Sequence, residues 1–470
     1  MPHSARSHRL SIVALLTLAT LHATPSKAAT LVVTTLDDTS PNGLSATVNA
    51  ASPGDVITFA SGLTGTIVLA SSPLTIASDL EIRGPGAMSI AIRPGGATRA
   101  LVVAGGKVTI SGLTLLPQPG GWAGGIQNGA DLTLRNVIIR ESLANGAGGG
   151  IRNDGNLTLW ECEVMRCGGS PGGGIFSASG TTLDLMSSTV AECSGVYGGG
   201  ISGDHATIQV VNSTVSHNGA DFGGGIALDG GSLTVTSSTI VSNTNSGQVS
   251  WGPGIYLPGS PSAQLRNSVV ALNRVSHGGY SDIVGDWTDL GFNLVGSDVD
   301  PMLSPLQNAG GLARVKVPLP GSPLIDRGHS SGYPYDELGH LRPYDDATIA
   351  NGSGSDGSDI GAVEAGATVI SVGPGPVLPS SRISALWPNP MRSVASVGYV
   401  LARGARIRLT IVAIDGRKVR HLRNGWRDAG TDVAVWDGTD DRGVRQPAGV
   451  YWVRFESEDH MEARRLVLIR

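Results

Sequence analysis

The stretch that decides the fold is VYGGGISGDHATIQVVNSTVSHN, which runs from Val196 to Asn218. It places three glycines before an isoleucine, then a run rich in threonine and valine, then an asparagine. The same glycine–isoleucine element recurs along the chain, with its isoleucine at Ile126, Ile151, Ile175, Ile201 and Ile226 and, in a looser form, at Ile255. A period of about 25 residues indicates a solenoid built from repeated coils.

Apolar residues keep the same period in two further places. After each isoleucine comes an apolar pair with one residue between its members: Leu132/Leu134, Leu157/Leu159, Leu183/Leu185, Ile208/Val210 and Leu233/Val235. A third column consists of Ile139, Val164, Val190, Val215, Ile240 and Val270. Strand alternation places these columns on the inner side of their strands. The pairs Val108/Ile110 and Leu80/Ile82 extend the pattern toward the N-terminus, to about eight coils.

Three short strands per coil, each stacked on its counterpart in the next coil, define a parallel β-helix. The alternative is a tandem of β-hairpins, but hairpin partners run in opposite directions and would not stack identical residues in columns. The sequence therefore predicts an all-β protein with a right-handed parallel β-helix, a pectin-lyase-like solenoid whose hand is that of its class. Glycines are expected at corners where φ is positive or where coils crowd each other.

A polar column accompanies the apolar ones. It consists of Ser142, Cys167, Cys193, Asn218, Asn243 and Asn273. Stacked amides hydrogen-bond to each other, so Asn218, Asn243 and Asn273 predict a structural ladder rather than a ligand site. Cys167 and Cys193 would lie one strand spacing apart, within reach of a disulfide, but parallel side chains leave that bond open. Cys162 falls in an inward column and predicts a buried thiol.

Composition and the first residues bear on location and partners. The chain has 68 Gly and only 15% charged residues, which favours short strands joined by tight turns. Basic residues followed by an apolar run from 10 to 23 and small residues predict a signal peptide over 1–29, and therefore export. No other stretch is long and apolar enough for a transmembrane helix in the mature chain. Dispersed basic residues without an aromatic platform argue against nucleic acid.

Three aspartates are the candidates for chemistry. Asp154, Asp204 and Asp229 each lie three residues after the isoleucine of their coil, although Ala178 interrupts the column. Asp204 and Asp229 would be adjacent, and such a pair could act in catalysis or hold Ca²⁺, with Asp154 as a further metal candidate. Solvated turn acids beside glycine explain the same residues without any function. No other cofactor is expected.

Other candidate features are weaker. GHSSG, from Gly328 to Gly332, matches the nucleophile-elbow pattern with Ser330, but a loop and a proline stand where the helix should follow. A column of alternating charge, Glu141, Arg166, Glu192 and His217, predicts an outward ion-pair ladder. Aromatics make up 4% of residues, and the tryptophans Trp122, Trp160, Trp251 and Trp287 are scattered, so no stacked sugar-binding track is predicted.

The repeat pattern ends near Asp300, and the blocks GSPLIDRG, DELGHLRP and SDIGAVE follow in that order. These blocks resemble the terminal segment of bacterial surface β-helix proteins called choice-of-anchor Q proteins. The stretch LVVTTLDDTSPNGLSATVNAASPGDVITF, from residue 31, looks like the opening segment of the same proteins, often named for a C-S-L-R-E-A motif, but it lacks the Arg and Glu of that motif. We expect a short helix here that covers the open edge of the first coil.

The last part of the chain resembles a second family. Its pieces are Pro388-Asn389-Pro390, Asp415-Gly416-Arg417, Trp436-Asp437-Gly438 and Ala448-Gly449-Val450-Tyr451. They are similar to the immunoglobulin-like C-terminal domains of flagellar hook-capping-type proteins and of type IX secretion cargo. In that family such domains are sorting or anchoring modules recognised at a Gram-negative-type outer membrane, which implies outer-membrane secretion machinery as a partner. A plain stabilising sandwich is the alternative.

The expected organisation is a signal peptide at 1–29, a β-helix with its N-terminal cap at 30–295, a terminal segment at 296–366, a Pro/Gly/Ser linker at 367–384 and an Ig-like β-sandwich at 385–470. By analogy with other β-helices, we expect a secreted or cell-surface platform that binds or adheres to polysaccharide or cell-surface glycan. An enzyme of this fold would be a polysaccharide lyase or glycoside hydrolase acting on acidic polysaccharide, and Asp204 and Asp229 would be its catalytic candidates.

Overall fold

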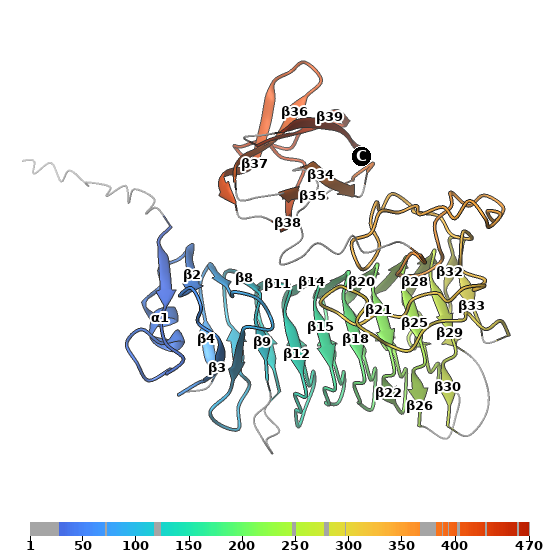
Figure 1. Cartoon of the computed structure of the whole chain (residues 1–470), viewed down its shortest axis with the longest axis horizontal. Coiled ribbons are helices and arrows are strands. Elements are labelled where there is room, and N and C mark those ends of the chain that lie inside the picture. The colour runs from blue at the N-terminus through green and yellow to red at the C-terminus, as the bar shows by residue number, and fades with distance from the viewer. Residues whose placement is uncertain are drawn as a thin grey trace, which may run out of the picture.

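The computed structural model describes residues 28–366 and 382–469, apart from 71–72, 117–123, 247–250, 277–281, 297, 388, 393, 402–404, 428–429 and 458–459. The expected signal peptide and most of the expected linker lie outside these residues. The described chain forms a long solenoid of β-strands and a separate antiparallel part near the C-terminus (Figure 1). Both parts are all-β apart from the helix α1 (Leu44–Ala50), so the predicted fold class is confirmed.

Three parallel sheets run along the solenoid (Figure 1). Sheet 1 contains β1 (Thr30–Val33), β2 (Asp55–Phe59), β5 (Leu80–Arg83), β8 (Lys107–Ser111), β11 (Asp131–Arg135), β14 (Asn156–Trp160), β17 (Thr182–Met186), β20 (Thr207–Val211), β24 (Ser232–Thr236), β28 (Ser262–Arg266) and β32 (Thr288–Asp289). Sheet 2 contains β3 (Gly65–Val68), β6 (Ile90–Arg93), β9 (Thr114–Leu115), β12 (Ile138–Arg140), β15 (Glu163–Met165), β18 (Thr189–Ala191), β21 (Thr214–Ser216), β25 (Thr239–Val241), β29 (Val269–Ala271) and β33 (Leu294–Val295).

Sheet 3 carries the isoleucines that follow the glycines. It contains β4 (Leu74–Ile76), β7 (Leu101–Val103), β10 (Ile126–Asn128), β13 (Ile151–Asn153), β16 (Ile175–Ser177), β19 (Ile201–Asp204), β23 (Ile226–Asp229), β27 (Ile255–Tyr256) and β31 (Ile283–Val284). A small fourth sheet contains β22 (Gly219–Ala220), β26 (Thr244–Asn245) and β30 (Arg274–Val275). Each coil passes from sheet 1 to sheet 2 and then to sheet 3.

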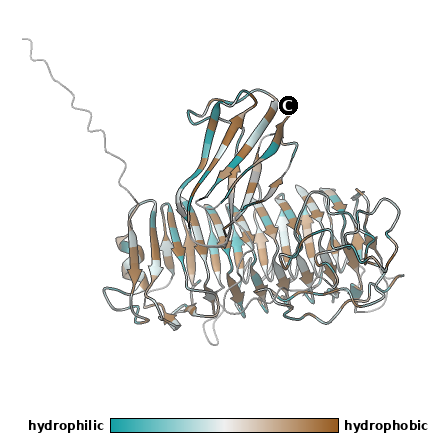
Figure 2. Ribbon diagram, turned by 45° about the horizontal axis from the view of Figure 1, so that its top comes forward, coloured by the Kyte–Doolittle hydropathy of each residue, from teal (hydrophilic) through white to brown (hydrophobic). Residues whose placement is uncertain are grey.

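The register between coils is the one that the sequence columns predict. Ile201 pairs in parallel with Ile175 on one side and with Ile226 on the other. Leu183 pairs with Ile208, and Val190 pairs with Val215, in the same manner. Strand residues alternate between hydrophobic and hydrophilic along the solenoid (Figure 2), and the apolar columns are buried inside. Identical aliphatic side chains therefore stack directly over one another.

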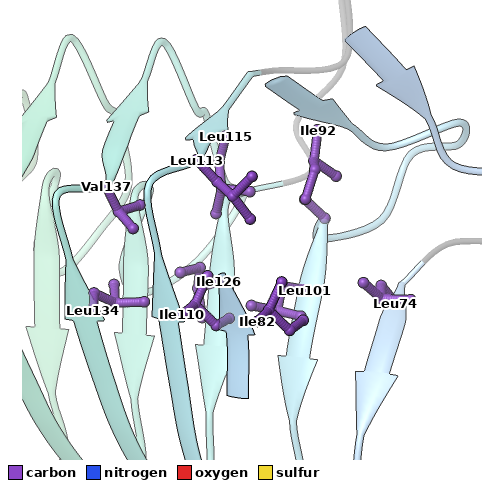
Figure 3. Close-up of a pocket in the computed structure, with 11 residues that line it drawn as sticks. Leu74, Ile82, Ile92, Leu101, Ile110, Leu113, Leu115, Ile126, Leu134 and Val137 are labelled. Atoms are coloured by element: carbon purple, nitrogen blue, oxygen red, sulfur yellow. The ribbon is translucent and has the colours of Figure 1, made fainter. Parts of the chain in front are cut away.

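The interior is packed with buried aliphatic side chains. The void lined by Leu74, Ile82, Leu101, Ile110 and their neighbours has a volume of only about 10 Å³. Figure 3 shows these side chains converging from strands of all three sheets. A void of this size holds at most about one water molecule. We therefore expect a binding site on the outer surface of the described solenoid rather than in this void.

Glycines have positive φ before sheet 3 and between sheets 3 and 1, as at Gly198 and Gly231, which agrees with the expectation, but other residue types also adopt positive φ. The first glycine of each repeat has a positive φ, as at Gly198 (φ 60°), and the next two pack against backbone of the adjacent coil. The corner between sheets 1 and 2 has positive φ at Asn136, Glu161, Ser187, Asn212, Ser237 and Asn267. The corner after sheet 2 has positive φ at Glu141, Arg166, Glu192, His217, Ser242 and Leu272.

The N-terminal end has the short helix that the opening segment predicts. Helix α1 lies beside β1 at this end of the solenoid (Figure 1). Its Leu44 and Val48 are buried in the hydrophobic core of the first coils. Asp38 fixes the start of the helix, because its carboxylate accepts hydrogen bonds from the backbone N–H (2.8 Å) and hydroxyl (2.6 Å) of Ser45.

Residues 298–366 form an irregular segment that docks on the outer side of sheet 2, and we call it the terminal segment. Arg314 from this segment contacts Glu163 (2.9 Å) and Glu192 (3.1 Å) of the solenoid. Glu192 also contacts Arg166 (3.6 Å), and Arg166 contacts Glu141 (2.7 Å), so the predicted outward ion-pair ladder is confirmed for these residues.

The C-terminal part is a β-sandwich of two antiparallel sheets. One sheet contains β34 (Arg382–Trp387), β35 (Ala395–Leu401) and β38 (Gly430–Trp436). The other contains β36 (Ala405–Ala413), β37 (Lys418–Arg427), β39 (Gly449–Glu456) and β40 (Met461–Leu468). Tyr399 and Trp436 of the first sheet share a buried core with Leu409 and Phe455 of the second. The sandwich begins at Arg382, three residues before the expected boundary.

Candidate functional site

The outer face of sheet 3 carries the residues that the sequence singled out for chemistry. In β19 and β23 the first residue, isoleucine, points inward, so the second and fourth residues of each strand lie on the outer side. The outer positions from β16 to β27 are Phe176, Ser202, Asp204, Ala227, Asp229 and Tyr256. This face lies opposite the apolar interior of the same strands, and its acids are exposed.

A row of aromatic rings borders this face. Tyr197, Phe222 and Trp251 each occupy the position before the first glycine of their coil. The rings of Tyr197 and Phe222 stack with centroids 4.5 Å apart and an interplanar angle of 9°. Phe222 lies 5.6 Å from Trp251, and Trp251 meets Tyr256 edge to face at 5.5 Å. We call Tyr197, Phe222, Trp251 and Tyr256 the aromatic cluster.

This cluster adds to the description of the aromatic residues as scattered, because its rings come from Tyr, Phe and Trp rather than from Trp alone. Trp160 and Trp287 lie apart from the cluster, and Trp122 lies outside the described residues. Tyr, Phe and Trp occur in turn at one column of the repeat. The sequence carries a signal for it, because VYGGGI, DFGGGI and WGPGI each place an aromatic residue before the glycine.

The aromatic cluster is open to solvent. The side chain of Tyr197 is 44% exposed, and the other three rings are partly exposed. Burial raises the pKa of the Tyr256 phenol, and the nearby Tyr197 and the negative charge of Asp229 raise it further. Tyr256 is the register partner of Ala227, which lies two residues before Asp229 on the same side of β23, so Asp229 lies next to the aromatic cluster. Aromatic surface and negative charge therefore occur together on this face.

Asp204 and Asp229 lie side by side, as their column predicts. They are register partners on the neighbouring strands β19 and β23. The Asp204 carboxylate bonds to Nδ1 of His205 at 2.7 Å, and this contact raises the pKa of the exposed imidazole. In the described part of the chain, Asp229 makes no side-chain hydrogen bond or ion pair. Of the two, Asp229 is the carboxylate available to a ligand.

Asp154 does not join this pair. Asp154 forms an ion pair with Arg152 of its own coil (2.8 Å). It lies two coils from Asp204, and Ala178 occupies the position between them in the column. Among the described residues, no group of three or more His, Cys, Asp or Glu side chains is arranged to hold a metal ion. Ca²⁺ at Asp204 and Asp229 stays an expectation, and backbone or solvent oxygens would have to complete its coordination.

The charge of the surrounding coils is one-sided. Residues 167–265, which include the strands from β16 to β24, contain five acidic residues and no Lys or Arg. His205 and His217 are the only residues of this stretch that can carry positive charge. Burial lowers the pKa of His217, which directly follows β21 at the end of sheet 2. On sheet 3 itself, the outer positions from β16 to β27 hold Asp204 and Asp229 and no Lys or Arg, so this face presents net negative charge at neutral pH.

Ser330 is not an activated nucleophile. Its hydroxyl donates directly to the Asp356 carboxylate at 2.6 Å. His329 does not stand between them, because its Nδ1 accepts the backbone N–H of Ser331 at 3.0 Å. In the nucleophile elbow a histidine takes the serine proton and a helix follows the turn; here the Ser330 hydroxyl bonds to a carboxylate instead, and no helix follows among the described residues.

The polar column inside the solenoid is structural. The Asn218 amide donates to Oδ1 of Asn243 (3.0 Å), and the Asn243 amide donates to Oδ1 of Asn273 (2.9 Å). All three side chains are completely buried, so a ligand cannot reach them. Cys162, Cys167 and Cys193 are buried free thiols. The predicted burial of Cys162 is confirmed, and burial raises the pKa of its thiol to about 12.

Two further ladders were missed in the sequence. Ser188, Ser213, Ser238 and Ser268 stack in one column. The hydroxyls of the last three each accept the backbone N–H of the serine one coil before, and the Ser188 hydroxyl accepts that of Cys162. Asn128 donates to Asn153 at 2.8 Å in a separate column. Both sets recur at the coil period, so their spacing was the signal. They add buried polar contacts between coils and contribute nothing to the outer face.

Comparison with known proteins agrees with this description. Residues 100–270 match a family model described as a right-handed β-helix region. This region covers the coils that carry the candidate site, and it supplies the hand of the solenoid. Comparison with the curated proteins and with the solved structures gives no significant match. In the described part of the chain, no helix has the length and apolar character that a membrane crossing requires.

Proposed function

We propose that the protein is an exported or cell-surface platform that binds glycan on the outer face of sheet 3. The observation that carries this proposal is the aromatic cluster, which lies in the open beside exposed hydrogen-bonding groups of Asp204 and Asp229. The right-handed β-helix region supports it as a fold-level analogy, because carbohydrate binding is one use of this architecture.

The physical argument rests on what a sugar ring needs. One face of a pyranose consists of C–H groups, which pack on the electron-rich face of an aromatic ring, while its rim of hydroxyls needs hydrogen-bonding partners. Tyr197 and Tyr256 combine an aromatic ring with a hydroxyl, and Asp229 is an acceptor without a partner among the described residues. The coils hold these groups on a rigid surface, so little ordering opposes binding.

Substitution of the aromatic cluster tests the proposal. The double variant Tyr197→Ala/Trp251→Ala should lose about tenfold or more in affinity for the glycan that the intact protein retains on a glycan array, since each ring supplies apolar contact area. Tyr344 and Trp452 are exposed aromatics elsewhere, so Tyr344→Ala/Trp452→Ala is the matched control and should bind normally. No retention of any glycan by the intact protein, or undiminished binding by the first variant, would contradict the proposal.

The pairing of Asp204 with Asp229 favours a second function, hydrolysis of a glycosidic bond. Glycosidases use two carboxylates on either side of the scissile bond, and these residues are neighbours across one strand spacing. A uronate lyase is less compatible with this face, because its outer positions from β16 to β27 contain no Lys or Arg to neutralise the substrate. Release of new reducing ends that stops in Asp204→Asn and Asp229→Asn would establish hydrolysis; binding without turnover would exclude it.

We further propose that the C-terminal sandwich is a sorting or anchoring module for outer-membrane secretion. The proposal rests on the resemblance of residues 385–470 and on the separate core of the sandwich, which gives a secretion apparatus a folded unit to recognise. Deletion of residues 382–470 should retain the protein in the periplasm of its Gram-negative-type host. Cell fractionation and immunoblotting locate the truncated protein, and its normal export would refute the proposal.

A further inference from the structure

We infer that the glycan bound on the outer face of sheet 3 carries protonated amino groups, as in a polymer of 2-amino-2-deoxyhexose, rather than uronic acids. The inference rests on the proposed glycan-binding function and names the chemical class of its ligand. It runs against the fold-level analogy, which pointed to acidic polysaccharide. The reasons are the charge of the coils, the position of one carboxylate, and the arrangement of the aromatic rings beside it.

The charge of the coils argues against a polyanion. The outer positions of sheet 3 from β16 to β27 carry Asp204 and Asp229, and no Lys or Arg. Recognition of a carboxylate or sulfate generally requires arginine or lysine, because these side chains supply positive charge and several donors. A uronate polymer would meet like charge on this face. A cationic polymer would meet complementary charge, which also speeds its association.

Asp229 is the carboxylate placed to receive an ammonium group. It is exposed, and among the described residues it has no hydrogen-bonding or ion-pair partner of its own. Asp204 beside it is already bonded to His205 at 2.7 Å. A hydrogen bond between an ammonium and a carboxylate is about twice as strong as a neutral one. An amino sugar therefore gains more from Asp229 than a neutral sugar does.

The rings next to Asp229 suit the same ligand. Tyr256 is the register partner of Ala227, two residues before Asp229 on the same side of the strand, and Trp251 meets Tyr256 at an interplanar angle of 71°. The faces of such rings attract cations as well as C–H groups, most strongly for tryptophan. A protonated amino sugar can stack its apolar face on one ring while its ammonium group reaches Asp229. Each element of the site then has a partner on the ligand.

The experiment compares three oligosaccharides by isothermal titration calorimetry at a pH at which the amines are protonated. The probes are the hexamer of glucosamine, the hexamer of N-acetylglucosamine and the hexamer of galacturonate. The glucosamine hexamer should bind about tenfold or more tightly than its acetylated counterpart, and the galacturonate hexamer should bind weakest. Added salt should weaken binding of the glucosamine hexamer more than that of the neutral hexamer.

Asp229→Asn should remove the preference, so that the glucosamine hexamer binds about as weakly as the acetylated one. Asp298→Asn is the matched control, since Asp298 is exposed, lies in the terminal segment rather than on sheet 3 and loses the same charge. Circular dichroism checks that both variants are folded. Equal or tighter binding of the acetylated or uronate hexamer, or a preference that survives Asp229→Asn, overturns this inference and leaves the proposed function intact. Failure to bind any glycan overturns both.

Discussion

Asn243 accepts two hydrogen bonds from Asn218 in the preceding coil, one from its side-chain amide and one from its backbone N–H, each at 3.0 Å. Asn273 accepts the same pair from Asn243 at 2.9 Å. The ladder ends at Asp282, whose Oδ1 accepts both donors of Asn273. Buried amides are thus paired from coil to coil, and the ladder holds the coils in one register.

Loss of a middle rung should destabilise the solenoid. Asn243→Ala leaves the amide and backbone donors of Asn218 buried without their acceptor, and an unpaired buried donor costs about 1–3 kcal/mol. We expect the midpoint of denaturant-induced unfolding to fall accordingly. Asn156→Ala is the control, because Asn156 donates to Asp131 on the exposed outer face of sheet 1. An equal effect of the two substitutions would show that the ladder adds no stability.

The glycines before sheet 3 should differ sharply in their tolerance of a side chain. A Cβ at Gly173 would lie 2.3 Å from the carbonyl oxygen of Ser194 in the next coil and 2.5 Å from that of Gly199. Gly173→Ala should therefore push adjacent coils apart and cost about 1–3 kcal/mol by overpacking. Gly146→Ala meets no atom within 4 Å and should leave the thermal midpoint nearly unchanged. Similar midpoints for the two variants would refute close coil packing as the reason for the repeated glycines.

Much of the solenoid could be predicted because its contacts are periodic. The register partners Ile201 and Ile226 are the same residue type one period apart, so the sequence column and the contact coincide. Asp204 and Asp229 were placed side by side for the same reason. Corners were predicted less well, because Glu141 and Arg166 adopt positive φ without being glycine and only the backbone geometry of the coil requires it.

The remaining contacts that were not predicted do not follow the period. The aromatic cluster depends on how rings orient toward each other, and Tyr256 joins it from a strand while Trp251 belongs to the loop column. The docking of the terminal segment could not be predicted, because Glu337 bonds to Thr189 and Thr214, which are 148 and 123 residues away in the sequence. No local pattern announces such a pairing, since either threonine alone looks like any other strand residue.

The contact of Glu337 with the solenoid makes the terminal segment sensitive to pH. Burial raises the pKa of the Glu337 carboxyl well above its ordinary value, while hydrogen bonds from Thr214 (2.5 Å) and Thr189 (2.9 Å) lower it only in part. Within the same segment, burial raises the pKa of Asp359 to about 6 and that of Glu364 to about 8, although Arg342 lies 2.8 Å from Glu364. The folded protein therefore holds protons that the unfolded chain releases.

Stability contributed by these groups should be complete below the unfolded carboxyl pKa of about 4.3 and should fall as pH rises through the folded values, to beyond about pH 8. We expect faster proteolytic cleavage of residues 298–366 at pH 8.5 than at pH 6, a pH at which Glu364 still holds its proton. Glu337→Gln keeps the size of the side chain and removes its charge, so it should slow cleavage at the higher pH and flatten the dependence. The exposed Glu141→Gln should leave the profile as it is. Cleavage that is independent of pH, or equally steep in Glu337→Gln, would assign the docking of the terminal segment to other contacts.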